Sequence, residues 1–248
     1  MEQRLFGISN NEVHLWYVHD QAIAIDSLPA NSYNILSVKE RVQQQKFRLA
    51  KHRHQYFITR LVLRNVLSKY ITSIKADAWV FTNNQYGKPR ITNAIAAASL
   101  DFNISHTDNM IVIAIVCNTT VGVDVERINR QAEILQLAER VFTTDEIAKL
   151  RITPLAAQRE CFFKLWTLKE SYIKARGMGM HIPLQQFGFD IIDNNISIKF
   201  LTDIIDNHNE WFFWSKKFNN LWQLALAVPK ISMKIREFTW QPAISFAN

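Results

Sequence analysis

Periodic patterns of apolar and polar residues divide the chain into a series of strands and helices. The apolar run from Met110 to Cys117 predicts a buried strand, and residues 54–70 and 154–176 carry apolar side chains at helical spacing. The same patterns predict shorter helices over 37–49 and 141–150, and strands over 11–20, 78–91, 100–107, 187–192, 195–201, 210–218 and 221–228. Thr144 is the expected N-cap of the helix at 141–150, and Gly177 is expected to end the long helix.

The order of these elements is repeated loosely in the second half of the chain. Aligning HQYFITRLVLR with ECFFKLWTLKE pairs Phe57 with Phe163 and Arg64 with Glu170. We therefore predict an α+β fold made of two similar α/β lobes, a pseudo-twofold duplication in which each lobe is a small, mainly antiparallel sheet packed with helices. The expected division is 1–117 for the N-terminal lobe and 118–248 for the C-terminal lobe, with a ligand site at their interface.

Composition narrows the class of protein. The 248 residues are 48% hydrophobic and 21% charged, which is typical of a soluble globular chain. The N-terminus has no apolar signal core and no run is long enough to span a bilayer, so we expect a cytoplasmic protein with no membrane partner. Cys117 and Cys161 are in no metal-ligand spacing and are expected to be buried free thiols. The net charge of +7 favours an anionic partner.

The strand VGVDVERI, residues 121–128, carries two carboxylates on one face. Residues two apart in a strand point the same way, so Asp124 and Glu126 stand side by side. A solvated, idle pair would be the ordinary explanation on an exposed strand. The short connection from the apolar strand at Met110–Cys117 instead indicates a central strand, where a Mg²⁺ ion would resolve the repulsion.

A third carboxylate is predicted on the long helix. Trp166, Glu170 and Lys174 are spaced four apart and share one helix face. A surface Glu–Lys pair of small energetic value is the plain alternative. The helix is largely apolar and should be buried, so Glu170 could complete the metal site and Lys174 could bind a phosphate or serve a reacting hydroxyl.

Further polar residues are candidates for contacts with a phosphorylated ligand. The pair Ser105–His106 ends a predicted strand, and no Gly-X-Ser-X-Gly elbow accompanies it, which argues against a hydrolase triad. Lys88 lies on the turn YGKP. A helical stripe places three cations near one face, namely Arg53, Arg60 and Arg64.

Three blocks in order resemble the Sfp-type 4′-phosphopantetheinyl transferases. They are FNISHT, VGVDVERI and FFKLWTLKESYIKARGMGM followed by HIPL, and YGKP before them also fits. The resemblance covers roughly Val38 to Val228, and chain length agrees with the Sfp type rather than with the half-sized trimeric synthases.

The resemblance implies a reaction, its substrates and its residues. Such enzymes move the phosphopantetheine arm of coenzyme A to a serine of an apo acyl or peptidyl carrier protein, release 3′,5′-adenosine diphosphate and use Mg²⁺. The family's metal ligands fall on Asp124, Glu126 and Glu170, and its catalytic pair on Glu170 and Lys174. Its coenzyme-binding residues fall on Lys88, Ser105 and His106, while Arg53 or Lys46 stands in for basic residues that hold the 3′-phosphate.

The sequence leaves the identity of the base and of the carrier open. The base is either Glu170 or a metal-bound water, and the carrier can belong to fatty-acid, polyketide or peptide synthesis. Met178 and Met180 are expected to contact a carrier, and a monomer is expected, since the duplication already makes a pseudodimer. The competing hypotheses are a nucleic-acid-binding protein, for which no motif is present, an inactive carrier-binding module and a metal-dependent nuclease.

Overall fold

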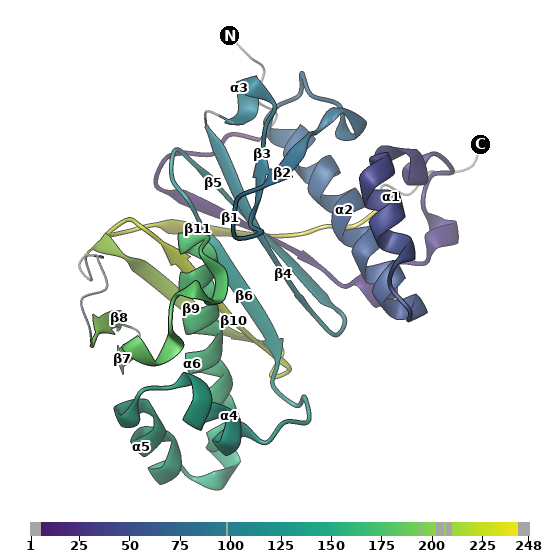
Figure 1. The fold of residues 1–248 in the computed structure, drawn as a ribbon. Coiled ribbons are helices and arrows are strands. Elements are labelled where there is room, and N and C mark those ends of the chain that lie inside the picture. The colour runs from purple at the N-terminus through teal and green to yellow at the C-terminus, as the bar shows by residue number, and fades with distance from the viewer. Residues whose placement is uncertain (1–5, 98, 194, 202–205, 207–209, 243–248) are drawn as a thin grey trace.

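The computed structural model describes residues 6–97, 99–193, 195–201, 206 and 210–242 (Figure 1). Its helices are α1 (Val38–Gln45), α2 (Ala50–Tyr70), α3 (Ala94–Ala97), α4 (Ile134–Val141), α5 (Thr144–Ile152) and α6 (Leu155–Arg176). Its strands are β1 (Glu12–Val18), β2 (Phe81–Asn83), β3 (Pro89–Ile91), β4 (Leu100–Thr107), β5 (Met110–Cys117), β6 (Gly122–Arg127), β7 (Phe187–Ile192), β8 (Asn195–Phe200), β9 (Phe212–Phe218), β10 (Trp222–Val228) and β11 (Lys234–Thr239). No helix in this part of the chain is both long and apolar enough to cross a membrane.

Two sheets with the same topology confirm the predicted pair of similar lobes. The first has the order β11-β1-β5-β4 and the second the order β6-β10-β9. Apart from β11, neighbouring strands in both sheets are antiparallel, so β1, β5 and β4 correspond to β6, β10 and β9. A long helix follows the first strand of each set, and a hairpin follows each long helix, β2–β3 after α2 and β7–β8 after α6.

The short helix directly before the long helix of each lobe begins in the same way in both lobes. Ser37 caps α1 in a capping box with Glu40, and Thr143 caps α5 in a capping box with Glu146. The two boxes are separated by the same spacing that separates Phe57 from Phe163, which supports the alignment made from the sequence. The predicted N-cap at Thr144 is wrong by one residue, because the hydroxyl of Thr143 is the one that accepts the backbone N–H of Glu146.

Each capping-box glutamate also forms a buried ion pair with the long helix of its lobe. Glu40 accepts two hydrogen bonds from the Arg64 guanidinium, and Glu146 lies 2.9 Å from Lys169 Nζ. Arg64 also donates hydrogen bonds to the carbonyls of Ala76 and Trp79, so its guanidinium group is bound to groups within its own lobe. The prediction that Arg64 contributes to a cationic face is therefore wrong.

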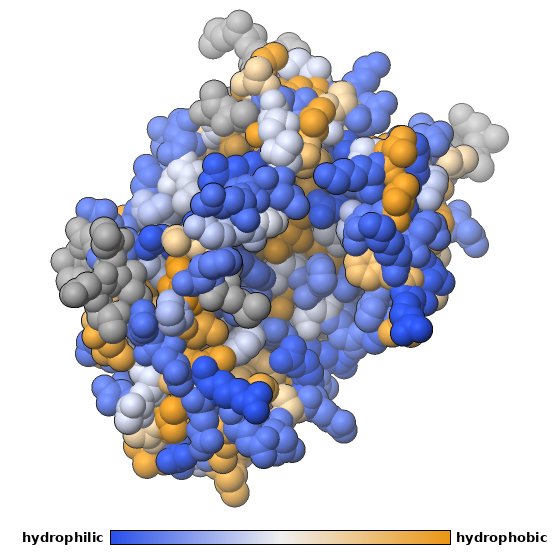
Figure 2. All heavy atoms as spheres, in the orientation of Figure 1, coloured by the Kyte–Doolittle hydropathy of each residue, from blue (hydrophilic) through white to orange (hydrophobic). Residues whose placement is uncertain are grey.

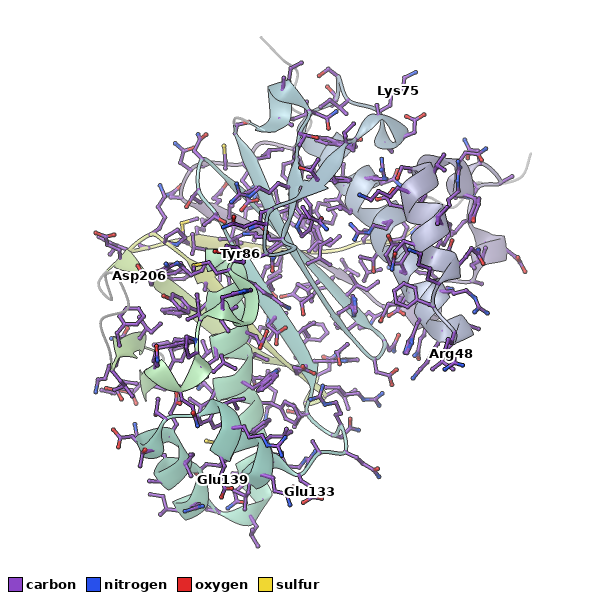
Figure 3. All side chains as sticks on the ribbon, viewed as in Figure 1. Arg48, Lys75, Tyr86, Glu133, Glu139 and Asp206 are labelled. Atoms are coloured by element: carbon purple, nitrogen blue, oxygen red, sulfur yellow. The ribbon has the colours of Figure 1, made fainter. Side chains whose placement is uncertain are left out.

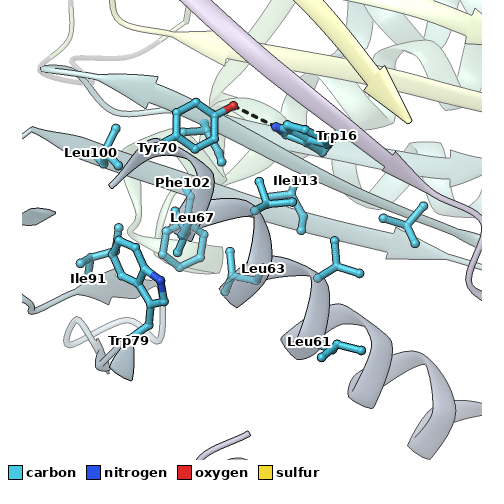
Figure 4. Close-up of a cluster of buried hydrophobic side chains, with 14 of the residues drawn as sticks. Trp16, Leu61, Leu63, Leu67, Tyr70, Trp79, Ile91, Leu100, Phe102 and Ile113 are labelled. Atoms are coloured by element: carbon cyan, nitrogen blue, oxygen red, sulfur yellow. Dashed lines mark hydrogen bonds between the residues drawn. The ribbon is translucent and has the colours of Figure 1, made fainter. Parts of the chain in front are cut away.

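The sheets pack face to face, and the long helices cover their outer faces (Figure 1). Side chains of β1 and β5 meet those of β6 and β10 in a core between the sheets. On the outer face of the first sheet, Leu63 and Leu67 of α2 pack with Phe102, and Trp16 donates a hydrogen bond to Tyr70 Oη (Figure 4). Burial of this apolar surface supplies the main driving force for folding.

The C-terminal strand does not follow the predicted lobe boundary. β11 pairs with β1 in parallel and so adds a fourth strand to the first sheet. The division at residues 117 and 118 remains a prediction for the chain as a whole, with β11 crossing it. Both cysteines are free thiols, as predicted. Cys117 is buried, whereas Cys161 on α6 is only half-buried.

The Lys169–Glu146 pair carries a testable prediction for stability. Lys169→Met should lower the free energy of unfolding by about 3–5 kcal/mol, since it leaves a buried carboxylate without its cation. Chemical denaturation measures this loss, with Lys164→Met on the half-buried side of the same helix as the matched control. Adding Glu146→Gln to Lys169→Met should recover part of the loss, and an equal or larger loss in the double variant would contradict the account.

Candidate active site

The close approach of β6 and α6 builds the site. Gly122, Asp124 and Glu126 share the face of β6 that meets α6, while Val123 and Val125 point into the core between the sheets. A Cβ atom at Gly122 would lie 1.9 Å from the carbonyl oxygen of Ser171, so only glycine admits the helix here. The predicted shared face of the two carboxylates is therefore present, and it is directed at the helix that carries Glu170 and Lys174.

Strand β4 covers the free edge of β6 with side chains. Asn103 Oδ1 accepts the backbone N–H of Val123 at 2.9 Å, and Ser105 Oγ accepts that of Val125 at 3.2 Å. The Ser105 hydroxyl donates to Asp124 Oδ1 at 2.8 Å. Asn103 was missed by sequence reasoning, although strand alternation from Ser105 places both side chains on one face.

Lys174 joins the two strands at the same point. Its Nζ lies 2.6 Å from Asp124 Oδ1 and 2.9 Å from Ser105 Oγ. Asp124 is only 5% exposed, and its other oxygen, Oδ2, is buried without a hydrogen-bond partner. An unpaired carboxylate oxygen in such a place is costly unless a cation or a donor from a ligand reaches it.

The other two acids lie within electrostatic reach of Asp124. Burial and then the negative charge of Asp124 raise the pKa of Glu126 to about 7, while Arg130 acts in the opposite direction. Arg130 Nη1 is 3.1 Å from Glu126 Oε2. Burial, followed by the charge of Asp124, also raises the pKa of Glu170, and Lys174 offsets part of this rise.

The donor set suits a hard divalent cation, and two of its carboxylates are paired with cations of the protein. Within the described ranges, no group of three or more His, Cys, Asp or Glu side chains lies close enough together to hold a metal ion. Lys174 binds Asp124, and Arg130 binds Glu126. The bare Oδ2 of Asp124 and the raised pKa values of its neighbours fit a site that gains stability from added positive charge. Metal ligation by Asp124, Glu126 and Glu170 stays a prediction.

Two cavities flank these residues. One, of about 780 Å³, runs from Glu126 and His106 to the first turns of α2 and includes Lys51 and Gln55. The other, of about 300 Å³, is bordered by Glu170, Lys174 and the turn between β2 and β3. On the face drawn in Figure 2, hydrophilic side chains predominate around smaller apolar groups.

The predicted coenzyme-binding residues are not equally free to bind a ligand. His106 lies at the end of β4, and part of its side chain is open to solvent at the first cavity. Neighbouring protein atoms partly desolvate the ring, and this, followed by the positive charge of Lys174, lowers the pKa of His106. Arg53 donates from Nη1 to the carbonyls of Phe47 and Arg48. The amino group of Lys88 donates hydrogen bonds to Thr120 Oγ1 and to the carbonyl of Val121.

Arg60 is a cation that the sequence grouped with Arg53 and Arg64 but did not single out. Its guanidinium lies 5.2 Å from the centre of the Tyr56 ring, and its Nε is buried without a hydrogen-bond partner. It borders a cavity with Lys39 and Lys46. Helical spacing places Arg60 on the same face as Arg53 and Arg64. Spacing alone cannot show which of these guanidinium groups has a donor without a hydrogen-bond partner.

Comparison with known proteins gives the same picture for both halves of the chain. A family model described as the 4′-phosphopantetheinyl transferase superfamily matches residues 120–227, and one described as 4′-phosphopantetheinyl transferase, N-terminal, matches residues 29–118. The two matches meet close to the connection between β5 and β6.

Three curated relatives show how far the likeness extends. The 4′-phosphopantetheinyl transferase HetI of Nostoc sp. is 31% identical over 173 residues, covering 69% of this chain and 71% of that protein. The enzyme gsp of Aneurinibacillus migulanus is 37% identical over 64% of this chain and 65% of its own length. Sfp of Bacillus subtilis is 28% identical over 71% of this chain and 74% of its own length. With Asp124, Glu126, Glu170 and Lys174 gathered where the two matched halves meet, the chain belongs to the Sfp-type 4′-phosphopantetheinyl transferases.

Proposed function

We propose that the protein transfers the 4′-phosphopantetheine arm of coenzyme A to a serine of an apo acyl or peptidyl carrier protein. The observation that carries the proposal is the contact among Ser105, Asp124 and Lys174 beside Glu126 and Glu170. A polar, partly buried cluster of both signs at the boundary of two lobes suits electrostatic catalysis on a pyrophosphate.

The chemistry requires one bond to form and one to break. The serine oxygen of the carrier forms a bond to the phosphorus that bears pantetheine, and the bridging oxygen leaves with 3′,5′-adenosine diphosphate. The serine proton passes to Glu170, which lies within electrostatic reach of Asp124 and Lys174. Lys174 provides positive charge where the pyrophosphate oxygens would lie.

Asp124, Glu126 and Glu170 are the residues that would hold a Mg²⁺ ion. When bound, the ion supplies positive charge to the phosphate oxygens and to the departing group. The oxygen-only donor set and the unpaired Oδ2 of Asp124 support this assignment. With phosphates present, Arg130 and Lys174 have alternative anionic partners and can release the carboxylates.

We further propose that coenzyme A contacts Ser105 and His106, with Arg53 as the remaining candidate from the family pattern, since the amino group of Lys88 is already held by protein oxygens. His106 is the best placed, since it is exposed in the cavity that also reaches Glu126. Arg60 and Lys46 border the neighbouring cavity and provide cations for the 3′-phosphate. The duplicated lobes suggest that a single chain forms the complete site, as a monomer.

His106→Ala should weaken coenzyme A binding about tenfold while leaving carrier binding nearly unchanged, because the ring faces the predicted phosphate side of the site. Isothermal titration with each ligand measures both constants. His181→Ala, which removes an exposed ring near Tyr86, is the control. An unchanged affinity of His106→Ala for coenzyme A would show that His106 does not bind the coenzyme and has a structural role instead.

The carrier interaction should depend on ionic strength. Carrier proteins are usually acidic and this chain has a net charge of +7, so kcat/KM for the carrier should fall about tenfold from low to high salt. Turnover at saturating carrier should change far less, since screening acts mainly on encounter. A salt-independent kcat/KM would contradict electrostatic steering. Met178, which was predicted to contact a carrier, is partly buried against the apolar core of the C-terminal lobe. The side chain of Met180 lies outside the described part of the chain.

Release of 3′,5′-adenosine diphosphate from coenzyme A tests the proposed function. Release should require the apo carrier and a divalent cation. Release without a carrier, or cleavage of nucleic acid under the same conditions, would favour a hydrolase or nuclease instead.

A further inference from the structure

The turn between β2 and β3, in the N-terminal lobe, contacts the C-terminal end of α6, which belongs to the C-terminal lobe. Asn84 organises this turn, since its Oδ1 accepts the backbone N–H groups of Tyr86 and Lys88, both at 2.9 Å. The Asn84 amide then donates to the carbonyl of Gly177 at 2.7 Å. Figure 3 shows Tyr86 close to this end of α6. The turn therefore supplies a partner to one of the carbonyls that a helix end leaves free.

Lys88 makes the second part of the same contact. Its side chain is 7% exposed, and its Nζ lies 2.8 Å from Thr120 Oγ1, 3.1 Å from the Val121 carbonyl and 3.4 Å from Asp101 Oδ2. The hydroxyl of Thr120 donates to Asp101 Oδ2 at 2.6 Å. Four elements meet at this amino group: the turn, strand β4, the connection between β5 and β6, and the end of α6. We call Asn84, Lys88, Thr120 and Asp101 the clasp.

The stem of Lys88 also lies against the end of the helix. A Cβ atom at Gly177 would be 3.0 Å from Lys88 Cδ and 3.2 Å from Asn84 Nδ2, so a side chain there would press on both members of the clasp. Gly177 has a φ of +64°, which favours glycine independently. The helix end is thus fitted closely to the turn that covers it.

The last turn of α6 is held from two sides. On one side, the missing side chain of Gly122 lets β6 approach the backbone of Ser171 and Ala175. On the other side is the clasp, with Lys88 Nζ 3.5 Å from the Ala175 carbonyl. Lys174, in this same turn, reaches Ser105 and Asp124. Displacement of the helix end would move the Lys174 ammonium away from both.

We propose that Lys88 is a positioning residue, which fixes the last turn of α6 and thereby places Lys174 in the site, rather than a cation that binds coenzyme phosphate. This inference rests on the proposed function for the role of Lys174. The hydrogens of the Lys88 amino group are directed at protein oxygens, and a phosphate would have to displace them. A lysine with this burial and these partners is suited to joining segments.

The experiment separates coenzyme affinity from turnover. Lys88→Met keeps the apolar stem and removes the amino group, and Thr120→Val removes its nearest partner while keeping the shape. Both variants should lower kcat about tenfold, because a small displacement of a catalytic group is costly. The Kd for coenzyme A, measured by calorimetry, should stay within about twofold of wild type. The exposed Lys75→Met is the matched control and should match wild type.

Combining the variants tests whether they act through one contact. The effects of Lys88→Met and Thr120→Val on kcat should be less than additive, since each breaks the same hydrogen bond. A tenfold weaker Kd for coenzyme A in Lys88→Met with unchanged kcat would overturn the proposal. So would a Thr120→Val variant with wild-type kcat.

Amide hydrogen exchange gives a measurement that does not depend on activity. Peptides covering 171–178 should exchange faster in both clasp variants, and peptides from α2 should be unchanged. If the wild type transfers nothing to any carrier, the proposed function fails, while the exchange result still decides whether the clasp holds the helix end. Unchanged exchange at 171–178 would overturn the clasp.

Discussion

Asp124→Asn should reduce phosphopantetheine transfer by about 10³-fold, because a cation at a reacting phosphate supplies several kcal/mol of charge stabilisation. Asparagine keeps the shape of the side chain and can still accept the hydrogen bonds that Lys174 and Ser105 donate. It removes the negative charge that would draw a divalent cation to this strand. The fold should be retained, since the neighbouring valines, Val123 and Val125, provide the packing.

Transfer rates with and without a chelator measure this effect, and circular dichroism checks the fold. Asp145→Asn, at an exposed position in the first turn of α5, is the matched control and should retain full activity. Full activity of Asp124→Asn, or of the wild type in excess chelator, would be incompatible with a metal-assisted reaction at this strand.

Glu170→Gln should lower kcat by about 10²–10⁴-fold through loss of the group that accepts the serine proton. The side chain is on the face of α6 that meets β6, within electrostatic reach of Asp124 and Lys174. Coenzyme affinity should change much less, since a loss confined to turnover marks an interaction made in the transition state.

Rapid-mixing kinetics at saturating coenzyme A and carrier give this value. Glu160→Gln on the same helix removes a half-exposed carboxylate paired with Lys217 and should have little effect. A Glu170→Gln enzyme with wild-type kcat would place the base elsewhere.

Much of the fold and the centre of the site could be predicted from periodicity. Strict alternation in 121–128 placed Asp124 and Glu126 on one face, and four-residue spacing placed Glu170 and Lys174 on another, because side-chain direction follows directly from strand and helix geometry. The repeat between the halves was also visible, since the two lobes preserve both the spacing of their helices and the capping boxes at Ser37 and Thr143.

Contacts between distant segments could not be predicted in this way. β11 was missed because it is a half-exposed strand with charged residues, Lys234, Arg236 and Glu237, whose pairing with β1 depends on the whole chain. The short helix α4 was also missed, although its pattern is amphipathic. Arg64 has the helical spacing of a surface cation, but it is paired with Glu40, which is 24 residues earlier in the chain. For β11 and Arg64, the partner is fixed by tertiary structure rather than by local pattern.

Intact-protein mass spectrometry of apo carriers tests the central claim most directly. A panel that covers fatty-acid, polyketide and peptide synthesis would be incubated with the protein, coenzyme A and Mg²⁺. We predict that at least one carrier gains the mass of a single phosphopantetheine arm, that its serine-to-alanine variant gains nothing, and that the Asp124→Asn enzyme modifies it about 10³-fold more slowly. A folded protein that binds coenzyme A but modifies no carrier in the panel would contradict the account and indicate an inactive carrier-binding module.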